Sequence, residues 1–131
     1  TGALGFEALS RGAAHATFVD SHRKAVSSLH AAADALGAEA EIFHRQADRF
    51  LREAAAKPQS ARVSWDIVFV DPPFRDERSY ADVLSALPEL LSPEGLVYVE
   101  HARRLPVSFT GYEVWKTTDV GEVSSRLLVK R

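Results

Sequence analysis

The sequence has 131 residues, of which 46% are apolar and 26% are charged, and this is the composition of one ordinary globular domain. It has no cysteine, which excludes disulfides and thiolate metal sites, and no apolar run approaches the roughly 20 residues of a membrane span; we therefore expect a cytoplasmic protein. The net charge of −2 disfavours a domain that holds a polyanion unaided, so a nucleic-acid partner would need a local basic surface or one outside this chain.

The first half of the chain alternates short apolar runs with helical patterns. Gly12 and Gly37 each follow a helical segment, as glycines that end helices do. Asp48 is a candidate N-cap. One face of the longest helix collects Ala25, Leu29, Ala32, Ala33 and Leu36. The predicted elements are the end of a helix at 7–11, a strand at 16–19, a helix at 22–36, a strand at 41–43 and a helix at 49–55.

The second half continues the alternation and closes differently. The run at 67–70 is continuously apolar, which is typical of a strand covered on both faces. Pro88 bends or ends the helix that contains it. The predicted elements are a loop at 57–62, a strand at 67–70, a helix at 80–91, a turn at 93–95, a strand at 96–99 and a hairpin made by 114–116 and 124–130.

Alternating strands and helices predict one α/β domain over residues 1–131, with a mostly parallel sheet, helices on both faces and a C-terminal antiparallel hairpin. Ligands bind such sheets at the carboxyl ends of the strands. Acidic residues at or just past the predicted strand ends are Asp20, Asp48, Asp71 and Glu100. These residues are the first candidates for a site.

The most specific motif is Asp71-Pro72-Pro73-Phe74, directly after the most apolar strand. Two prolines make the peptide stiff and remove two N–H donors, so it presents acceptors: the Asp71 carboxylate and the Pro72 carbonyl. A motif this short also occurs as a simple chain break, but its place after a buried parallel strand and before an aromatic residue favours a site.

An exocyclic amine needs such a set of acceptors. Its lone pair is delocalised into the base, and two acceptors that hold its hydrogens draw the nitrogen toward tetrahedral geometry and free the lone pair to attack a methyl sulfonium. The same acceptors stabilise the positive charge that develops on nitrogen. Phe74 offers a face for base stacking, worth about 1–3 kcal/mol.

Three weaker features indicate a nucleoside-type ligand. Thr1-Gly2-Ala3 opens a helix, where backbone approaches a ligand closely and an anionic group is favoured. Asp20, followed by Ser21, ends the next strand and is suited to bind ribose hydroxyls; a role in capping the following helix is the alternative. Asp48 is suited to accept from an adenine amine, and N-capping is equally compatible.

The histidines show no metal-ligand spacing. His15, His22, His30, His44 and His101 are interpreted as surface or loop residues, and Glu100-His101 as an ordinary pair rather than an acid/base couple. No metal site is predicted. Four arginines flank the proposed site: Arg75, Arg78, Arg103 and Arg104. Most arginines in such positions are solvated surface charge, but four near one opening are suited to contact phosphates.

These motifs, in this order, resemble the class I S-adenosylmethionine methyltransferases and, more closely, the RsmD family, over essentially the whole chain. The most specific stretches are residues 1–13, 18–20 and 66–74. The resemblance implies a Rossmann-like fold and methyl transfer from S-adenosylmethionine to guanine N2 in small-subunit ribosomal RNA. It also implies that Thr1-Gly2-Ala3 meets the methionine part of the cofactor, that Asp20 holds the ribose and that Asp48 holds the adenine amine. Ser21, next to Asp20, is a further candidate for cofactor binding, and Asp71 to Phe74 are implied to hold the target amine.

The resemblance implies a ribosomal RNA or small-subunit particle as partner, with no membrane and no metal. Adenine N6, cytosine N4, a glutamine amide and a non-catalytic nucleotide-binding or scaffold role remain alternatives. The family's glycine loop follows a strand at the centre of the sheet, and the family also has an N-terminal arm, often basic. We therefore expect that strand and arm to be missing from residues 1–131. The strands that end at Asp20 and Asp71 are then expected not to pair directly.

Overall fold

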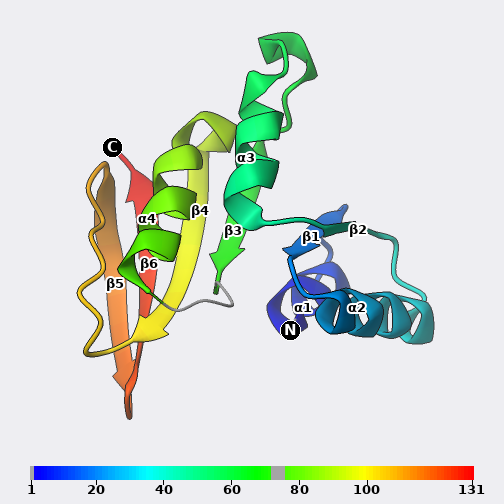
Figure 1. Cartoon of the computed structure of the whole chain (residues 1–131), viewed down its shortest axis with the longest axis horizontal. Coiled ribbons are helices and arrows are strands. Elements are labelled where there is room, and N and C mark those ends of the chain that lie inside the picture. Colours follow the sequence, from blue (N-terminus) through cyan, green and yellow to red (C-terminus); the bar gives the residue numbers. More distant parts are fainter. Residues whose placement is uncertain (1, 72–75) are drawn as a thin grey trace. The chain divides into compact units, whose positions relative to one another are not determined.

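The computed structural model describes residues 2–71 and 76–131 and shows an α/β chain (Figure 1). The chain divides into two compact units, Thr1–Phe50 and Leu51–Arg131. The boundary falls inside helix α3 (Ala47–Ala56). No helix in the described ranges is long and apolar enough to cross a membrane.

The first unit is built on two parallel strands. β1 (Ala16–Asp20) pairs with β2 (Ala40–His44) from Ala16 opposite Ala40 to Asp20 opposite His44. The helices α1 (Ala3–Ser10) and α2 (Arg23–Leu36) contact β1. α2 ends where Gly37 takes a φ of 62°, the left-handed geometry that favours glycine.

A small aromatic cluster forms the core of this unit. The ring of Phe18 on β1 stacks on Phe6 of α1 at 4.6 Å between centroids, and Leu29 of α2 is buried. A Cβ on Gly5 would stand 2.4 Å from the Phe18 ring, closer than packed atoms allow. Glycine at this position therefore lets α1 lie directly against β1.

The second unit is a mixed sheet in the order β3-β4-β6-β5. β3 (Trp65–Val70) and β4 (Leu91–Ala102) are parallel, whereas β6 (Val123–Lys130) is antiparallel to both β4 and β5 (Tyr112–Val120). The short 3₁₀ helices η1 (Gln59–Ala61) and η2 (Pro88–Leu90) precede β3 and β4. The α/β class and the C-terminal hairpin are as the sequence predicts.

Helix α4 (Glu77–Ala86) covers one face of this sheet. Asp76 caps it by accepting a hydrogen bond from the Ser79 N–H at 2.7 Å. The hydroxyl of Tyr80 donates to the carbonyl of Glu100 at 2.6 Å, and the hydroxyl of Tyr112 donates to the carbonyl of Leu84. The residues that are completely buried in this core include Tyr80, Leu87, Leu90, Val97, Val99 and Leu128.

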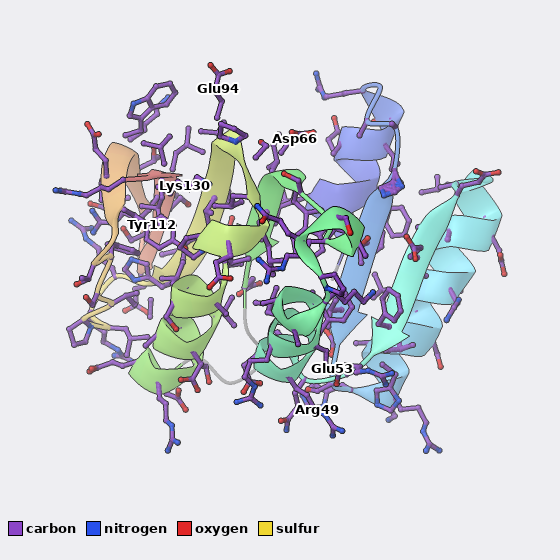
Figure 2. The ribbon with its side chains drawn as sticks, turned by 90° about the horizontal axis from the view of Figure 1, so that it is seen from above. Arg49, Glu53, Asp66, Glu94, Tyr112 and Lys130 are labelled. Atoms are coloured by element: carbon purple, nitrogen blue, oxygen red, sulfur yellow. The ribbon has the colours of Figure 1, made fainter. Side chains whose placement is uncertain are left out.

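The hairpin is tied to the segment before β4. The Lys130 ammonium donates to the carbonyls of Pro88 and Leu91, each at 3.2 Å, and Tyr112 lies on the neighbouring strand (Figure 2). These two long-range bonds join the last strand of the sheet to the start of β4. They hold the amino end of β4 beside the carboxyl end of β6.

Three local predictions were wrong. Asp48 lies inside the first turn of α3 rather than at its N-cap, because the carbonyl of Gln46 already accepts from the Phe50 N–H. The turn at 93–95 is an irregular part of the single strand β4. The apolar face predicted for α2 buries Leu29 and Ala33, and its last member, Leu36, is 66% exposed. The run at 67–70 is not covered on both faces, since Ile67 is 52% and Phe69 39% exposed.

Each unit has its own ladder. Among the described residues β1 is hydrogen-bonded to β2, and β3 is hydrogen-bonded to β4. The expectation that the strands ending at Asp20 and Asp71 do not pair directly stays a prediction.

Candidate functional site

Asp20 lies at the carboxyl end of β1 and shapes the turn into α2. Its Oδ1 accepts a hydrogen bond from the N–H of His22 at 2.8 Å, and its carbonyl accepts from the N–H of Arg45 at 3.0 Å. His22 is the N-cap of α2 and makes no side-chain cap bond. The carboxylate thus supports the turn before the helix through Oδ1, which leaves Oδ2 for a ligand.

Gly2 lies on the same side of β1 as Asp20. A Cβ built on Gly2 would stand 3.4 Å from the ring of Phe18, and side chains two apart on a strand share a face. Gly2 has a φ of 86° as N-cap of α1, and no side chain caps the helix. The first amides of α1 therefore offer donors of the kind that bind an anionic group.

The remaining candidates of the first unit gather at the same edge. Ala3 is the first residue of α1, and the carbonyl of Ser21 accepts from His44 Nε2 at 3.0 Å. Asp48 follows the end of β2, whose last residue is paired with Asp20. Thr1 lies outside the described residues. Gly2, Ala3, Asp20 and Ser21 thus lie around the carboxyl end of β1, and Asp48 lies in the first turn of the helix that follows β2.

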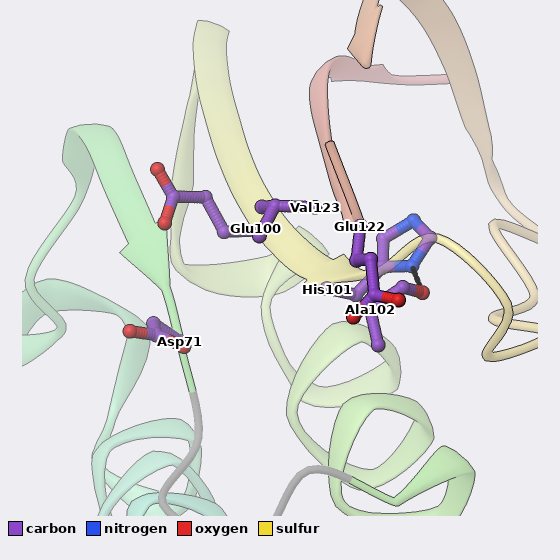
Figure 3. A pocket seen from close by; sticks show the side chains of 6 residues that line it. All are labelled: Asp71, Glu100, His101, Ala102, Glu122 and Val123. Carbon is purple, nitrogen blue, oxygen red and sulfur yellow. Dashed lines mark hydrogen bonds between the residues drawn. The ribbon is translucent and has the colours of Figure 1, made fainter. Parts of the chain in front are cut away.

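In the second unit, Asp71 follows β3 directly and comes opposite Glu100 of β4, because the parallel register pairs Val70 with Val99. Pro72, Pro73 and Phe74 lie outside the described residues. A hollow of about 200 Å³ adjoins the two carboxylates (Figure 3). Its lining residues are Asp71, Glu100, His101, Ala102, Glu122 and Val123.

The carboxylate of Glu100 is held by a neighbour that the sequence analysis did not identify. The hydroxyl of Tyr98 lies 2.9 Å from Glu100 Oε1 and 3.2 Å from the Ser125 hydroxyl. The Ser125 contact lowers the pKa of Tyr98, but desolvation and the Glu100 carboxylate outweigh it, and the pKa is raised above 10.0. Tyr98 therefore remains a neutral donor at physiological pH.

The signal for Tyr98 is present in the sequence. Tyr98 and Glu100 are two residues apart on a strand and so share one face of the sheet. Ser125 joins them because β6 pairs it with Glu100, and this long-range pairing is not readable from local pattern.

His101 is buried, at 4% exposure, so its interpretation as a surface or loop residue was wrong. Its Nδ1 donates to the carbonyl of Ala102 at 2.8 Å, and its ring packs edge-on against Tyr80 at 6.1 Å. Figure 3 shows Glu100 extending toward β3 and His101 on the other side of β4. The two side chains do not form an acid/base couple, as expected.

The other histidines are exposed, as predicted: His15, His22, His30 and His44. In the ranges that the structure covers, no three His, Asp or Glu side chains are grouped to hold a metal ion. Of the flanking arginines, Arg78 pairs with Asp82 at 3.9 Å, and Arg75 lies outside the described residues.

The chain is similar to known proteins over nearly its whole length. Residues 1–129 match the model of a family described as Conserved hypothetical protein 95. A comparison with curated protein sequences gave no match.

Two solved structures share 32% identity with the chain. One is described as a candidate methylase from Haemophilus influenzae, with a TM-score of 0.79 over 97% of this chain and 79% of that one. The other is described as a candidate methyltransferase from Escherichia coli, with a TM-score of 0.80 over 98% of this chain and 70% of that one. A ribosomal protein L11 methylase from Lactobacillus delbrueckii, at 13% identity and a TM-score of 0.78 over 99% of this chain and 65% of that one, shares the fold.

Proposed function

Because the chain belongs to the Conserved hypothetical protein 95 family, the family of the RsmD methyltransferases, we propose that it transfers a methyl group from S-adenosylmethionine to the N2 amine of a guanine. The proposed substrate is small-subunit ribosomal RNA, either free or in the particle. The methyltransferase family and the fold rest on the similarities above. The donor, the base and the RNA are the proposal.

The first unit has residues that fit the donor. S-adenosylmethionine, when bound, supplies an electrophilic methyl group on a sulfonium. The uncapped amides of α1 suit its carboxylate, the carboxylate of Asp20 suits the ribose hydroxyls, and Asp48 suits the adenine amine. Glycine is required at position 2 because its φ is 86° and a Cβ there would stand 2.4 Å from the buried side chain of Leu29.

The second unit has residues that fit the acceptor amine. Asp71 accepts one hydrogen of the amine, and the carbonyl of Pro72 is proposed to accept the other. These two acceptors free the nitrogen lone pair for attack on a methyl sulfonium and stabilise the charge that develops on nitrogen. Phe74 is proposed to stack on the base.

The observation that supports the choice of guanine is that three acidic residues, Asp71, Glu100 and Glu122, line the hollow. Ionised carboxylates only accept hydrogen bonds. The pairing edge of guanine carries the N1–H and the N2 amine, both donors, whereas adenine and cytosine place a ring-nitrogen acceptor beside their amines. An acceptor-lined hollow therefore favours guanine over adenine N6 and cytosine N4.

The test is transfer of tritiated methyl groups from S-adenosylmethionine to ribosomal RNA and to assembled small subunits, followed by nuclease digestion and chromatography of the nucleosides. N2-methylguanosine is the expected product. Label in N6-methyladenosine, N4-methylcytidine or a glutamine side chain would contradict the assignment of guanine and identify the methylated group instead. Binding of S-adenosylmethionine without transfer to any of these substrates would instead support a non-catalytic nucleotide-binding domain.

A further inference from the structure

The loop that follows β4 carries Arg103 and Arg104 beside a second hollow. This hollow measures about 360 Å³ and is lined by Ala102, Arg103, Arg104, Gly121 and Glu122. Ala102 and Glu122 also line the carboxylate hollow that contains Asp71. The two hollows therefore adjoin at the carboxyl end of β4; three acidic residues line the first, and two arginines line the second together with Glu122.

Arg103 fixes the geometry of this loop against the β5–β6 turn. Its N–H donates to the carbonyl of Glu122 at 2.7 Å, and its guanidinium donates to the carbonyl of Gly121 at 3.3 Å. The same guanidinium lies 3.9 Å from the Asp119 carboxylate. These contacts hold Arg103 in place and offset part of its charge.

Arg104 is different. It is exposed, and no carboxylate pairs with it among residues 2–71 and 76–131. An unpaired guanidinium presents a planar fork of N–H donors that matches the geometry of phosphate oxygens. Arg104 is thus a positive group left available at the rim of a hollow next to the proposed base site.

The order of charges along these two hollows matches a nucleotide within a strand. A guanine offers donors to the carboxylates of the first hollow, and its backbone phosphate is an anion that carries most of the affinity in nucleic-acid binding. We propose that Arg104 binds a backbone phosphate adjacent to the target guanine, so that the RNA strand passes over residues 102–104 and the β5–β6 turn. This inference rests on the proposed function and names the RNA contact of the same site. It also provides the local basic group that a chain of net charge −2 needs.

The test compares the variants Arg104→Ala and Arg104→Lys with a charge-matched control, Lys57→Ala. Lys57 is exposed, and its carbonyl accepts from Arg62, which pairs with Glu89 just before β4. Lys57 is therefore near the amino end of β4, at the opposite edge of the sheet from Arg104. Its loss changes the net charge by the same amount without touching either hollow.

Binding of a short single-stranded RNA is measured by fluorescence anisotropy at several salt concentrations. Arg104→Ala should bind roughly tenfold more weakly, and the slope of log K against log salt should become less steep by about 0.7, the single-strand value for one phosphate contact. Arg104→Lys should keep most of the slope and recover part of the affinity. Calorimetry should show unchanged affinity for S-adenosylmethionine in all three variants.

The outcomes separate the two proposals. If the wild type methylates RNA and Arg104→Ala matches Lys57→Ala in affinity and salt slope, the phosphate contact is overturned and the proposed function stands. If the wild type neither binds nor methylates RNA, the proposed function fails and the phosphate contact fails with it.

Discussion

Asp71 and Glu100 are neighbours at the carboxyl edge of β3 and β4, because the parallel register pairs Val70 with Val99. Adjacent strands lie about 4.8 Å apart, so two acidic residues from distant parts of the chain line one hollow. The hydroxyl of Tyr98 holds Glu100 from the same face. This pair of residues motivates the first two predictions.

Replacing Asp71 should remove methyl transfer and leave the affinity for S-adenosylmethionine nearly intact. Asp71→Asn keeps the shape but loses the charge that stabilises the amine, and we expect a loss of about 100-fold or more in kcat, as for other preorganised electrostatic groups. Asp71→Ala should be at least as impaired. Tritium transfer measures the first effect and calorimetry the second; near-wild-type turnover in either variant would contradict the role.

Replacing Glu100 with Gln should weaken the preference for guanine and lower the pKa of Tyr98. The Glu100 carboxylate raises the pKa of Tyr98, so an uncharged amide should shift the titration of the phenol toward lower pH. NMR of labelled tyrosine measures this shift. Glu122→Gln is the matched control, because Glu122 lines the same hollow without contacting Tyr98. In this variant Tyr98 should titrate as it does in the wild type.

Replacing Asp20 should separate its two roles. Asp20→Asn keeps an oxygen that accepts from the His22 N–H and should keep the melting temperature, but it should lose affinity for S-adenosylmethionine. Asp20→Ala should lower both the melting temperature and the affinity for S-adenosylmethionine. An unpaired ribose hydroxyl costs about 1–3 kcal/mol, or roughly five- to a hundredfold in affinity. The contrary outcome is that both variants bind S-adenosylmethionine as tightly as the wild type and only Asp20→Ala melts at a lower temperature. Asp20 would then have only the structural role in the turn before α2.

Tyr112 should make the protein less stable in alkali. Burial raises its pKa above the ordinary value of 10.0, so the unfolded chain loses the phenol proton first and the free energy of unfolding falls as the pH rises above about 10. Tyr112→Phe should flatten this dependence. At neutral pH the same variant should be less stable by about 1–3 kcal/mol, because the carbonyl of Leu84 loses its donor.

Denaturant unfolding at neutral and alkaline pH measures both effects. Tyr98→Phe serves as a comparison, since Tyr98 is only partly buried and its loss should change the alkaline dependence less. If the free energy of unfolding falls equally steeply with pH in the wild type and in Tyr112→Phe, another group causes the loss of stability in alkali.

Local sequence determined the elements and the candidate residues of each strand end. Strand and helix periodicity, helix-ending glycines such as Gly37 and the acidic residues after apolar runs act within a few positions of the chain. Asp20 and Asp71 were therefore identifiable before the fold was known. The position of Asp48 within its helix could not be identified from the sequence, because the first residue of a helix depends on which backbone groups form hydrogen bonds.

Tertiary structure alone decided which of these residues meet. The pairing of β4 with β3 brings Glu100 to Asp71, and its pairing with β6 brings Ser125 to Glu100. Packing of α4 on one face of the sheet buries His101 and leaves Ile67 and Phe69 exposed on the strand that the sequence predicted to be covered. These outcomes depend on register and on the choice of face between segments far apart in the chain, and no local pattern contains that information.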